Sequence, residues 1–124
     1  EILAVGLATE LPATPAVMLM QWVTIAPGAD IPGDEADTTM SFFLMESGSL
    51  QMTASKPLTV IRAEALATAL QSPGAMPQME EMAANAAFTL EAGDSVLIPP
   101  GVGGSLRNDG TEPAVILATQ IFPA

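Results

Sequence analysis

The sequence predicts a single all-β domain, a β-sandwich or small β-barrel, with a short α-helical insertion at about residues 63–87. Many short stretches have the composition and alternation of strands, and Gly- and Pro-rich turns separate them at short intervals. An alanine-rich stretch in the middle places Leu66 and Leu70 four residues apart, which is a helical spacing. A length of 124 residues suits one domain with its own core, so we expect residues 1–124 to form one unit.

The first predicted strand covers residues 16–26. Alternation places one set of side chains on each face, and both sets are largely apolar, which favours a strand inside a sandwich or barrel over a solvent-facing one. The following stretch, residues 27–39, is dense in Pro and Gly and is predicted to be a loop. This loop carries four carboxylates: Asp30, Asp34, Glu35 and Asp37.

The remaining strands are predicted from β-rich runs bounded by turn residues. Residues 40–48 and 49–55 form a hairpin that turns at Ser47–Gly48. Residues 57–63 follow as a short strand, with Pro57 at its permitted first position. After the insertion, four more strands are expected at residues 88–92, 95–99, 104–108 and 113–122. In the insertion itself, Met76, Met79 and Met82 lie three residues apart, on one side of a helix.

Composition excludes several classes of function. Three basic residues stand against fourteen acidic ones, for a formal charge of −11, so nucleic acid and anionic membrane surfaces are not expected as partners. The chain has neither cysteine nor histidine, which rules out disulfides, zinc fingers, thiol nucleophiles and Ser-His-Asp triads. No apolar run reaches the ~20 residues that span a bilayer, so membrane insertion is not expected.

We also expect the protein to be exported, to the periplasm or the extracellular space. It begins at Glu1 rather than Met, which suggests that an upstream segment was removed, and it is acidic and poor in lysine.

Residues 93–108 carry a motif of known type. Gly93, Pro99, Gly101 and Asn108 have the spacing of the second cupin motif, G-x5-P-x-G-x2-H-x3-N, with Gly104 in the place of the histidine. The first cupin motif, G-x5-H-x-H-x4-E-x6-G, matches only at its two glycines, residues 28 and 48. The chain therefore resembles a small cupin over roughly residues 16–122, which implies a cupin-type jelly-roll β-barrel.

Cupin metal centres use three histidines and a glutamate, and imidazole suits the transition metals bound there. The corresponding positions in this chain are Asp34, Ala36, Ser41 and Gly104. Only one of these is a good ligand, so we expect no metal and no other cofactor.

Two other groups of residues could bind a metal, and each also has a purely structural interpretation. The carboxylates of loop 27–39 could hold Ca²⁺, but a solvated acidic loop is expected. The three methionines could hold copper, but the buried edge of a helix is expected.

Functional hypotheses follow from the loss of metal ligands at the position where cupins bind their metal. Loss of the polar ligands leaves an apolar pocket, lined by Asp34, Ser41, Phe43, Met45, Gly104 and Leu106, with Met76, Met79 and Met82 as a possible lid. The first hypothesis is a non-catalytic module that binds or senses a small apolar or weakly polar molecule. The alternatives are an unconventional isomerase or lyase that uses carboxylates or a recruited cation, and a filled structural barrel that forms a homodimer. A barrel pocket below ~300 Å³ would favour the filled barrel.

Overall fold

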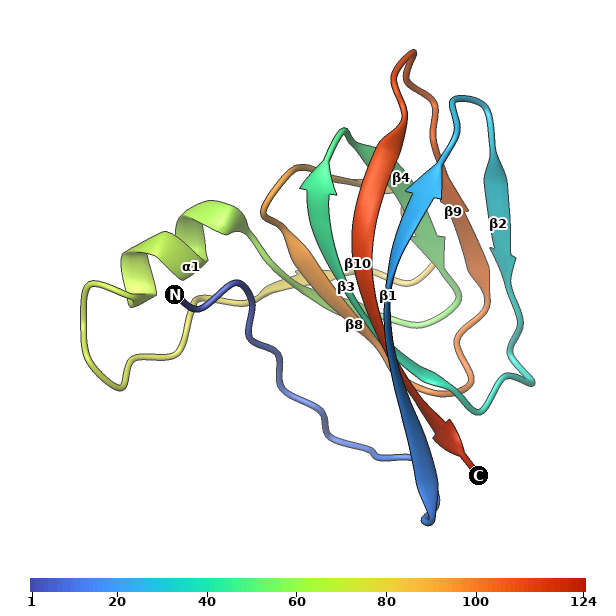
Figure 1. Cartoon of the computed structure of the whole chain (residues 1–124), viewed down its shortest axis with the longest axis horizontal. Helices are drawn as coiled ribbons and strands as arrows, with labels where there is room; N and C mark the ends of the chain where they lie inside the picture. Colours follow the sequence, from blue (N-terminus) through green and yellow to red (C-terminus); the bar gives the residue numbers. More distant parts are fainter.

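The structure, a computed structural model, describes all 124 residues and is built almost entirely from antiparallel strands (Figure 1). Its one helix is α1 (Ala63–Ala69). The strands are β1 (Ala16–Ile25), β2 (Asp30–Gly33), β3 (Met40–Ser47), β4 (Leu50–Ala54), β5 (Leu58–Ile61), β6 (Glu80–Met82), β7 (Phe88–Leu90), β8 (Ser95–Ile98), β9 (Gly104–Arg107) and β10 (Ala114–Pro123).

Two sheets face each other. The larger has the order β1-β10-β3-β8-β5-β6, and the smaller has the order β2-β9-β4-β7. Apart from β5 and β6, which pair with each other, successive strands cross between the sheets, which is the connectivity of a jelly roll. The cupin-type jelly-roll fold predicted from the sequence is confirmed, and with it the strands expected between residues 40 and 61 and after residue 87. The predicted hairpin of residues 40–48 and 49–55 is wrong, because the turn at Ser47–Gly48 carries the chain from the larger sheet to the smaller one, and β3 and β4 do not pair.

The core lies between the two sheets, where inward-facing side chains of both pack together. It contains fifteen buried residues, and among the most deeply buried are Met45, Leu50, Val60 and Leu90. Alternation along each strand explains this arrangement, since every second side chain of β4 and β5 is buried. Several of these core residues, among them Met52, Leu106, Ile116 and Ala118, also line a cavity between the sheets.

Strand β1 differs from the prediction. It forms one edge of the larger sheet and pairs only with β10, and most of its residues are exposed. The expectation of an interior strand was therefore wrong. The two apolar faces of β1 have different surroundings. Val23 faces the barrel interior, whereas Met18, Met20 and Trp22 lie on the outer face of the sheet.

The insertion also differs in detail. Only residues 63–69 are helical, and the expected helix over the methionine-bearing part does not form. Residues 70–79 make turns and irregular chain, and residues 80–82 form β6, which extends the sheet next to β5. Two prolines, Pro73 and Pro77, fall in this segment, and each removes a backbone N–H that a helix needs. Short strand β2 within loop 27–39 was likewise not predicted.

The N-terminal residues 1–15 have no regular structure and run across the outside of the larger sheet (Figure 1). Val5 and Leu7 lie next to Phe42 and Ile61 there. The arm therefore covers part of the outer face of the sheet, whereas Met18, Met20 and Trp22 on the outer face of β1 are exposed. No helix in the structure is both long and apolar enough to cross a membrane.

Candidate functional site

A cavity of about 260 Å³ lies between the two sheets, and core residues such as Met52, Leu106 and Ile116 line its inner end. It is reached from the side where β8 ends and β3 begins, which is the lower end of the barrel in Figure 1. This is the region in which the two cupin motifs place their metal.

The wall on the larger sheet becomes more polar toward the mouth. Along β10, the inward-facing side chains are Ile116, then Ala118, then Gln120. Neighbouring β3 follows the same order, because Phe43 is paired with Ala118 and Ser41 with Gln120. The cavity therefore has an apolar inner end and a polar outer end.

Side-chain amides and a hydroxyl form the polar end. Ser41 is buried, and its Oγ accepts a hydrogen bond from Gln120 Nε2 at 3.4 Å. Gln21 on β1 donates from Nε2 to Oε1 of Gln120 at 3.5 Å. These are long hydrogen bonds, and no bond donated by the Ser41 hydroxyl to another protein group is present. The polar groups thus retain capacity to bond a ligand.

The facing wall comes from the smaller sheet and contains Ile31, Met52 and Leu106. Beyond them the wall is backbone, at Gly33 and Gly104, which are opposite each other on β2 and β9. A wall without side chains at this point leaves room that a larger residue would occupy.

Gly104 has a φ of 129°, a conformation that residues with a Cβ rarely adopt. A Cβ built on it would overlap the carbonyl oxygen of Thr53 on the neighbouring strand β4. The backbone at this position is therefore incompatible with the histidine of the cupin motif.

The mouth is formed by two loops, residues 34–39 and 99–103. They are joined by a hydrogen bond from the Gly101 N–H to the Asp37 carbonyl at 2.9 Å. Asp34 and Asp37 both line the cavity, and each uses Oδ1 to accept a backbone N–H of its own loop, at 2.8 and 2.9 Å. Those bonds hold the loop in shape and leave the second carboxylate oxygen of each residue free of protein partners.

The residues present do not fit a cupin metal. Ala36 and Gly104 offer no donor atom, and Ser41 offers only a neutral hydroxyl. No three acidic side chains gather closely enough to hold a metal ion, which also applies to the four carboxylates considered for Ca²⁺. We therefore derive no chemistry through a metal.

The structure brings together five of the nine residues proposed for the site. Asp34, Ser41, Phe43, Gly104 and Leu106 all line the cavity. Met45 does not, because it lies one step deeper on β3 and is 1% exposed within the core.

The three lid methionines also lie elsewhere. Met76 is 55% exposed, Met79 faces the outer side of the larger sheet near Leu97, and Met82 packs against the core from β6. None of them lines the cavity, so the structure does not place a lid there. They also do not share one side of a helix, because the segment is not helical.

Sequence reasoning missed six polar residues of the cavity: Gln21, Asp37, Thr39, Thr53, Ser105 and Gln120. A signal was present for the two glutamines. Each interrupts an otherwise apolar strand on its inward face, and an isolated polar residue at such a position suggests a role inside the barrel. The pairing of β10 with both β1 and β3 was needed to bring them together.

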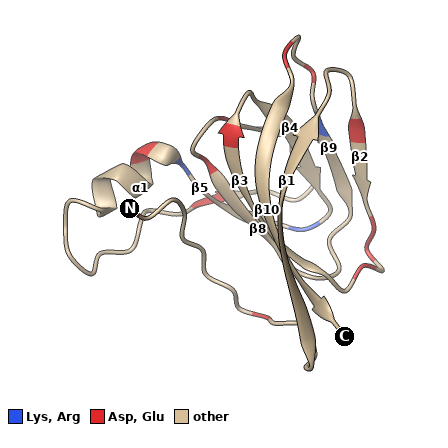
Figure 2. Ribbon diagram, viewed as in Figure 1, with Lys and Arg blue, Asp and Glu red and all other residues tan.

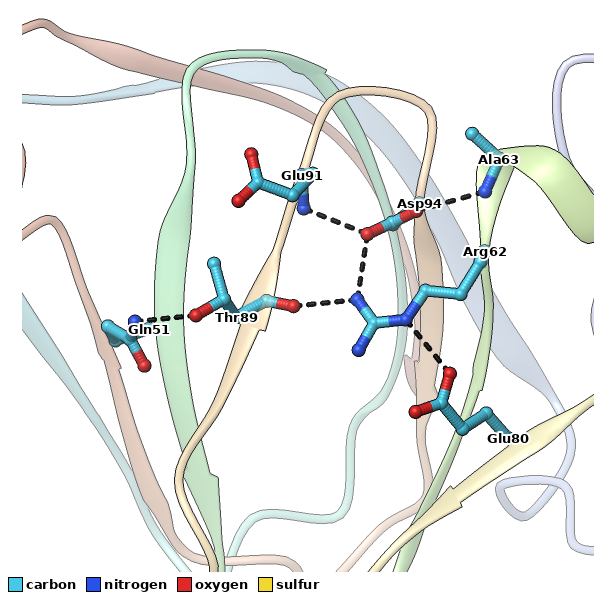
Figure 3. Close-up of polar contacts among 7 residues, drawn as sticks. All are labelled: Gln51, Arg62, Ala63, Glu80, Thr89, Glu91 and Asp94. Atoms are coloured by element: carbon cyan, nitrogen blue, oxygen red, sulfur yellow. Dashed lines mark hydrogen bonds and ion pairs between the residues drawn. The ribbon is translucent and has the colours of Figure 1, made fainter.

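The most extensive polar network of the molecule lies outside the cavity (Figure 3). Asp94 is 4% exposed and accepts hydrogen bonds from Arg62 Nη1 at 2.8 Å and from the N–H groups of Ala63 and Glu91 at 2.9 Å each. Arg62 also binds Glu80 at 3.1 Å. Burial lowers the pKa of Arg62, but the hydrogen bonds and charges of Asp94 and Glu80 outweigh it and raise the pKa above its ordinary value. This network joins α1 to the β7–β8 turn and has a structural role.

Comparison with known proteins bears on the fold. No family model matches the chain, and no curated protein matches it in sequence. Among solved structures, the chain is similar to the cupin domain of Schizosaccharomyces pombe Cnp3, at 15% identity, 91% coverage of this chain and a TM-score of 0.47. It is also similar to RmlC of Streptococcus suis, solved in complex with dTDP-D-xylose, at 8% identity, 84% coverage and a TM-score of 0.46.

The chain spans 61% of the length of the Cnp3 domain and 43% of the length of RmlC. The fold assignment stands on the strand order and on the positions of the two motifs. The protein has the fold of a cupin, with a histidine-free site.

Proposed function

We propose that the protein binds a compact small molecule in the barrel cavity without catalysing a reaction. The observation that carries the proposal is a cavity at the vacated metal position that combines an apolar inner end with a polar mouth. Small-molecule sites in proteins have this composition, in which a few polar groups orient a ligand within an apolar surface.

The volume of the cavity limits the ligand. About 260 Å³ lies below the ~300 Å³ at which the usual range for drug-sized ligands begins, and by that criterion it weighs toward a filled barrel. The space would hold about nine water molecules at the ~30 Å³ that each occupies in the liquid. The proposal is therefore confined to compact ligands and excludes large ones such as a nucleotide.

The alternative of an isomerase or lyase has no supporting observation. Asp34 and Asp37 are exposed, each is engaged in its own loop, and neither is hydrogen-bonded to a second acid or base. General acid–base catalysis needs a group held within reach of the reacting proton. A binding module requires only the cavity and its polar mouth.

Ligand-detected and protein-detected NMR with 3,3-dimethylbutan-1-ol tests the proposal. This neutral alcohol has a compact apolar end and one polar group, and we expect it to shift the methyl signals of Ile116, Ala118 and Leu106. A dissociation constant on the order of 1 mM is expected for so small a molecule. The Ala118→Leu variant should lose binding because its side chain fills the cavity.

Thr119→Leu is the matched control, since the neighbouring residue of β10 lies on the outer face of the same sheet. It should bind the alcohol as the parent protein does. Equal binding by both variants, or an absence of methyl shifts with this alcohol and with a set of other compact neutral fragments, would show that the cavity does not bind ligands.

A second proposal concerns self-association, which the exposed strand β1 favours. Its free edge presents unpaired backbone groups, and Met18, Met20 and Trp22 beside it are 62–70% exposed. Residues 11–29 contain no charged side chain although the chain carries a formal charge of −11, and Figure 2 shows β1 free of charge along its length. An exposed apolar edge strand can pair with a second copy across a two-fold axis, with little charge repulsion at the contact.

Sedimentation equilibrium tests the homodimer. The parent protein should be dimeric at micromolar concentration, and Met20→Lys should shift it to monomer by placing a charge at the contact. Met76→Lys is the control, because Met76 is also more than half exposed but lies in the irregular segment after α1. A parent protein that is monomeric across the accessible concentration range would refute dimerisation.

A further inference from the structure

We infer that the cavity selects a compact amphiphile with a cationic head group, such as a primary or quaternary amine, over neutral or anionic molecules of the same shape. The inference rests on the proposed binding function and adds the charge and orientation of the ligand. It is carried by the polarity of the walls, by the charges at the mouth and by the unused hydrogen-bonding capacity there.

Orientation follows from the gradient along the walls. Ile116 and Phe43 lie toward the inner end with Val23, and Gln120 and Ser41 lie toward the mouth. An amphiphile would place its apolar group against the inner side chains and keep its polar head among the amides and hydroxyls. The reverse orientation would bury a polar head without partners, which is costly.

The charge follows from the ionisable residues around the cavity. Asp34 and Asp37 are the two that line it, and no lysine or arginine does so. Each aspartate has one carboxylate oxygen without a protein partner, and neither forms an ion pair. An anionic head at this mouth would be repelled, whereas a cationic head would be attracted.

Two further charged side chains lie at the mouth, Glu35 on loop 34–39 and Lys56 next to loop 99–103. The Cγ of Glu35 lies next to Gly103, and Nζ of Lys56 lies next to Gly101, 3.4 Å from the position a Cβ would take there. They are opposite in sign, neither lines the cavity, and the two aspartates therefore determine the net charge of the mouth. The overall charge of −11 acts in the same direction at longer range.

The buried polar group at the mouth gives an independent indication of a ligand. Ser41 is 8% exposed, its single hydrogen bond is a long one accepted from Gln120, and its hydroxyl proton has no acceptor in the protein. A serine hydroxyl can donate one hydrogen bond as well as accept, so this donor is available to a ligand. A head group that both accepts and donates hydrogen bonds, such as an amine next to a hydroxyl or ether, would accept the hydroxyl proton of Ser41 and donate to the other polar groups of the mouth.

Three ligands of nearly equal shape isolate the effect of charge. These are 3,3-dimethylbutylamine, 3,3-dimethylbutan-1-ol and 3,3-dimethylbutanoate, which share the same apolar group and carry heads of charge +1, 0 and −1 at pH 7. Titrations followed by methyl NMR at low ionic strength should rank them amine, alcohol, carboxylate. Two carboxylates at the mouth should favour the amine over the alcohol by about tenfold.

Variants locate the source of the preference. Asp34→Asn with Asp37→Asn keeps the acceptors that shape the loop and should reduce the ratio of amine to alcohol affinity to about twofold or less. Glu91→Gln with Glu112→Gln is the control, because it makes the same change in net charge at exposed residues that do not line the cavity. Added salt should reduce the preference in the parent protein.

The outcomes of these titrations test the cation preference separately from the proposed binding function. If the alcohol binds as tightly as the amine, the cavity binds ligands but the inferred cation preference is refuted. An equal loss of preference in both double variants would also refute it, since the net charge and not the mouth would then be responsible. If none of the three ligands binds and other compact fragments also fail, both this inference and the proposed function are wrong.

Discussion

Nη1 of Arg62 lies 2.8 Å from Oδ2 of Asp94, and this ion pair joins the start of the helix to the turn between β7 and β8. The arginine side chain is 28% exposed and the aspartate side chain 6%. Asp94 follows Gly93 in the second cupin motif, whose chemistry is absent here, yet its carboxylate is fully hydrogen-bonded. The turn at Gly93–Asp94 therefore has a structural role in this protein.

The first prediction concerns this ion pair. Asp94→Ala would leave a partly buried Arg62 without its main partner and two backbone N–H groups without an acceptor. We expect a loss of about 3 kcal/mol of unfolding free energy, the lower end of the cost of breaking a buried pair, because Arg62 is partly exposed. Urea unfolding of the parent protein and of Asp94→Ala measures this change in unfolding free energy.

Asp109→Ala provides the control for that prediction. It removes the partner of Arg107, to which Asp109 is bound at 2.7 Å on the protein surface. Exposed ion pairs contribute little to stability. If the two variants unfold at the same urea concentration, the structural role of Asp94 is contradicted.

A second prediction concerns Gly104, the residue in the histidine position. Gly104→Ala should destabilise the protein by about 3 kcal/mol or prevent folding, because the added Cβ meets the Thr53 carbonyl and φ is positive. Gly74→Ala isolates the effect of φ, since Gly74 has a φ of 76° but no atom near the position of a Cβ. We expect Gly74→Ala to lose less stability than Gly104→Ala, and thermal unfolding measures both losses. A fully stable Gly104→Ala protein would contradict the structure at this position.

The third prediction separates the core from the cavity on β3. Met45→Ala removes a side chain that is 1% exposed and should cost about 3 kcal/mol while leaving ligand binding unchanged. Phe43→Ala alters the cavity wall itself, so the affinity for 3,3-dimethylbutan-1-ol should fall. The two variants are compared by chemical denaturation and by NMR titration. Loss of binding in Met45→Ala with an intact fold would mean that the pocket extends deeper than the structure shows.

The fourth prediction concerns Asn108, the last residue of the second motif. It is 1% exposed, and its Nδ2 donates to the carbonyls of Ile25 and Glu112, while its Oδ1 accepts the Gly110 N–H. Asn108→Ala should cost about 3 kcal/mol because buried backbone groups lose their partners.

Gln51→Ala is the comparison for Asn108, since Gln51 is only half-buried and makes one bond, to Thr89 Oγ1 at 2.6 Å. A loss of about 1 kcal/mol is expected there. Differential scanning calorimetry gives both values, and equal costs would contradict a special role for Asn108.

The sequence by itself determined the class of fold and most of its strands, because those depend on local rules. β-rich runs bounded by turn residues identified β3, β4 and β10, and turn residues such as Gly93 and Asn108 marked where the chain reverses. Their requirements are set by backbone conformation and nearby hydrogen bonds, which a short stretch of sequence expresses. The missing histidines could also be counted without a structure.

Tertiary structure decided the position of β1, the composition of the cavity mouth and the conformation of Gly104, which local sequence does not specify. The apolar strand β1 could have been central or at an edge, and only the sheet order places it at the edge. Gln21, Ser41 and Gln120 come together at the mouth only through pairing between β1, β10 and β3, which are distant in sequence. The conformation of Gly104 likewise depends on Thr53 in another strand. Such contacts arise from packing over the whole chain, so the cavity became visible only in the folded protein.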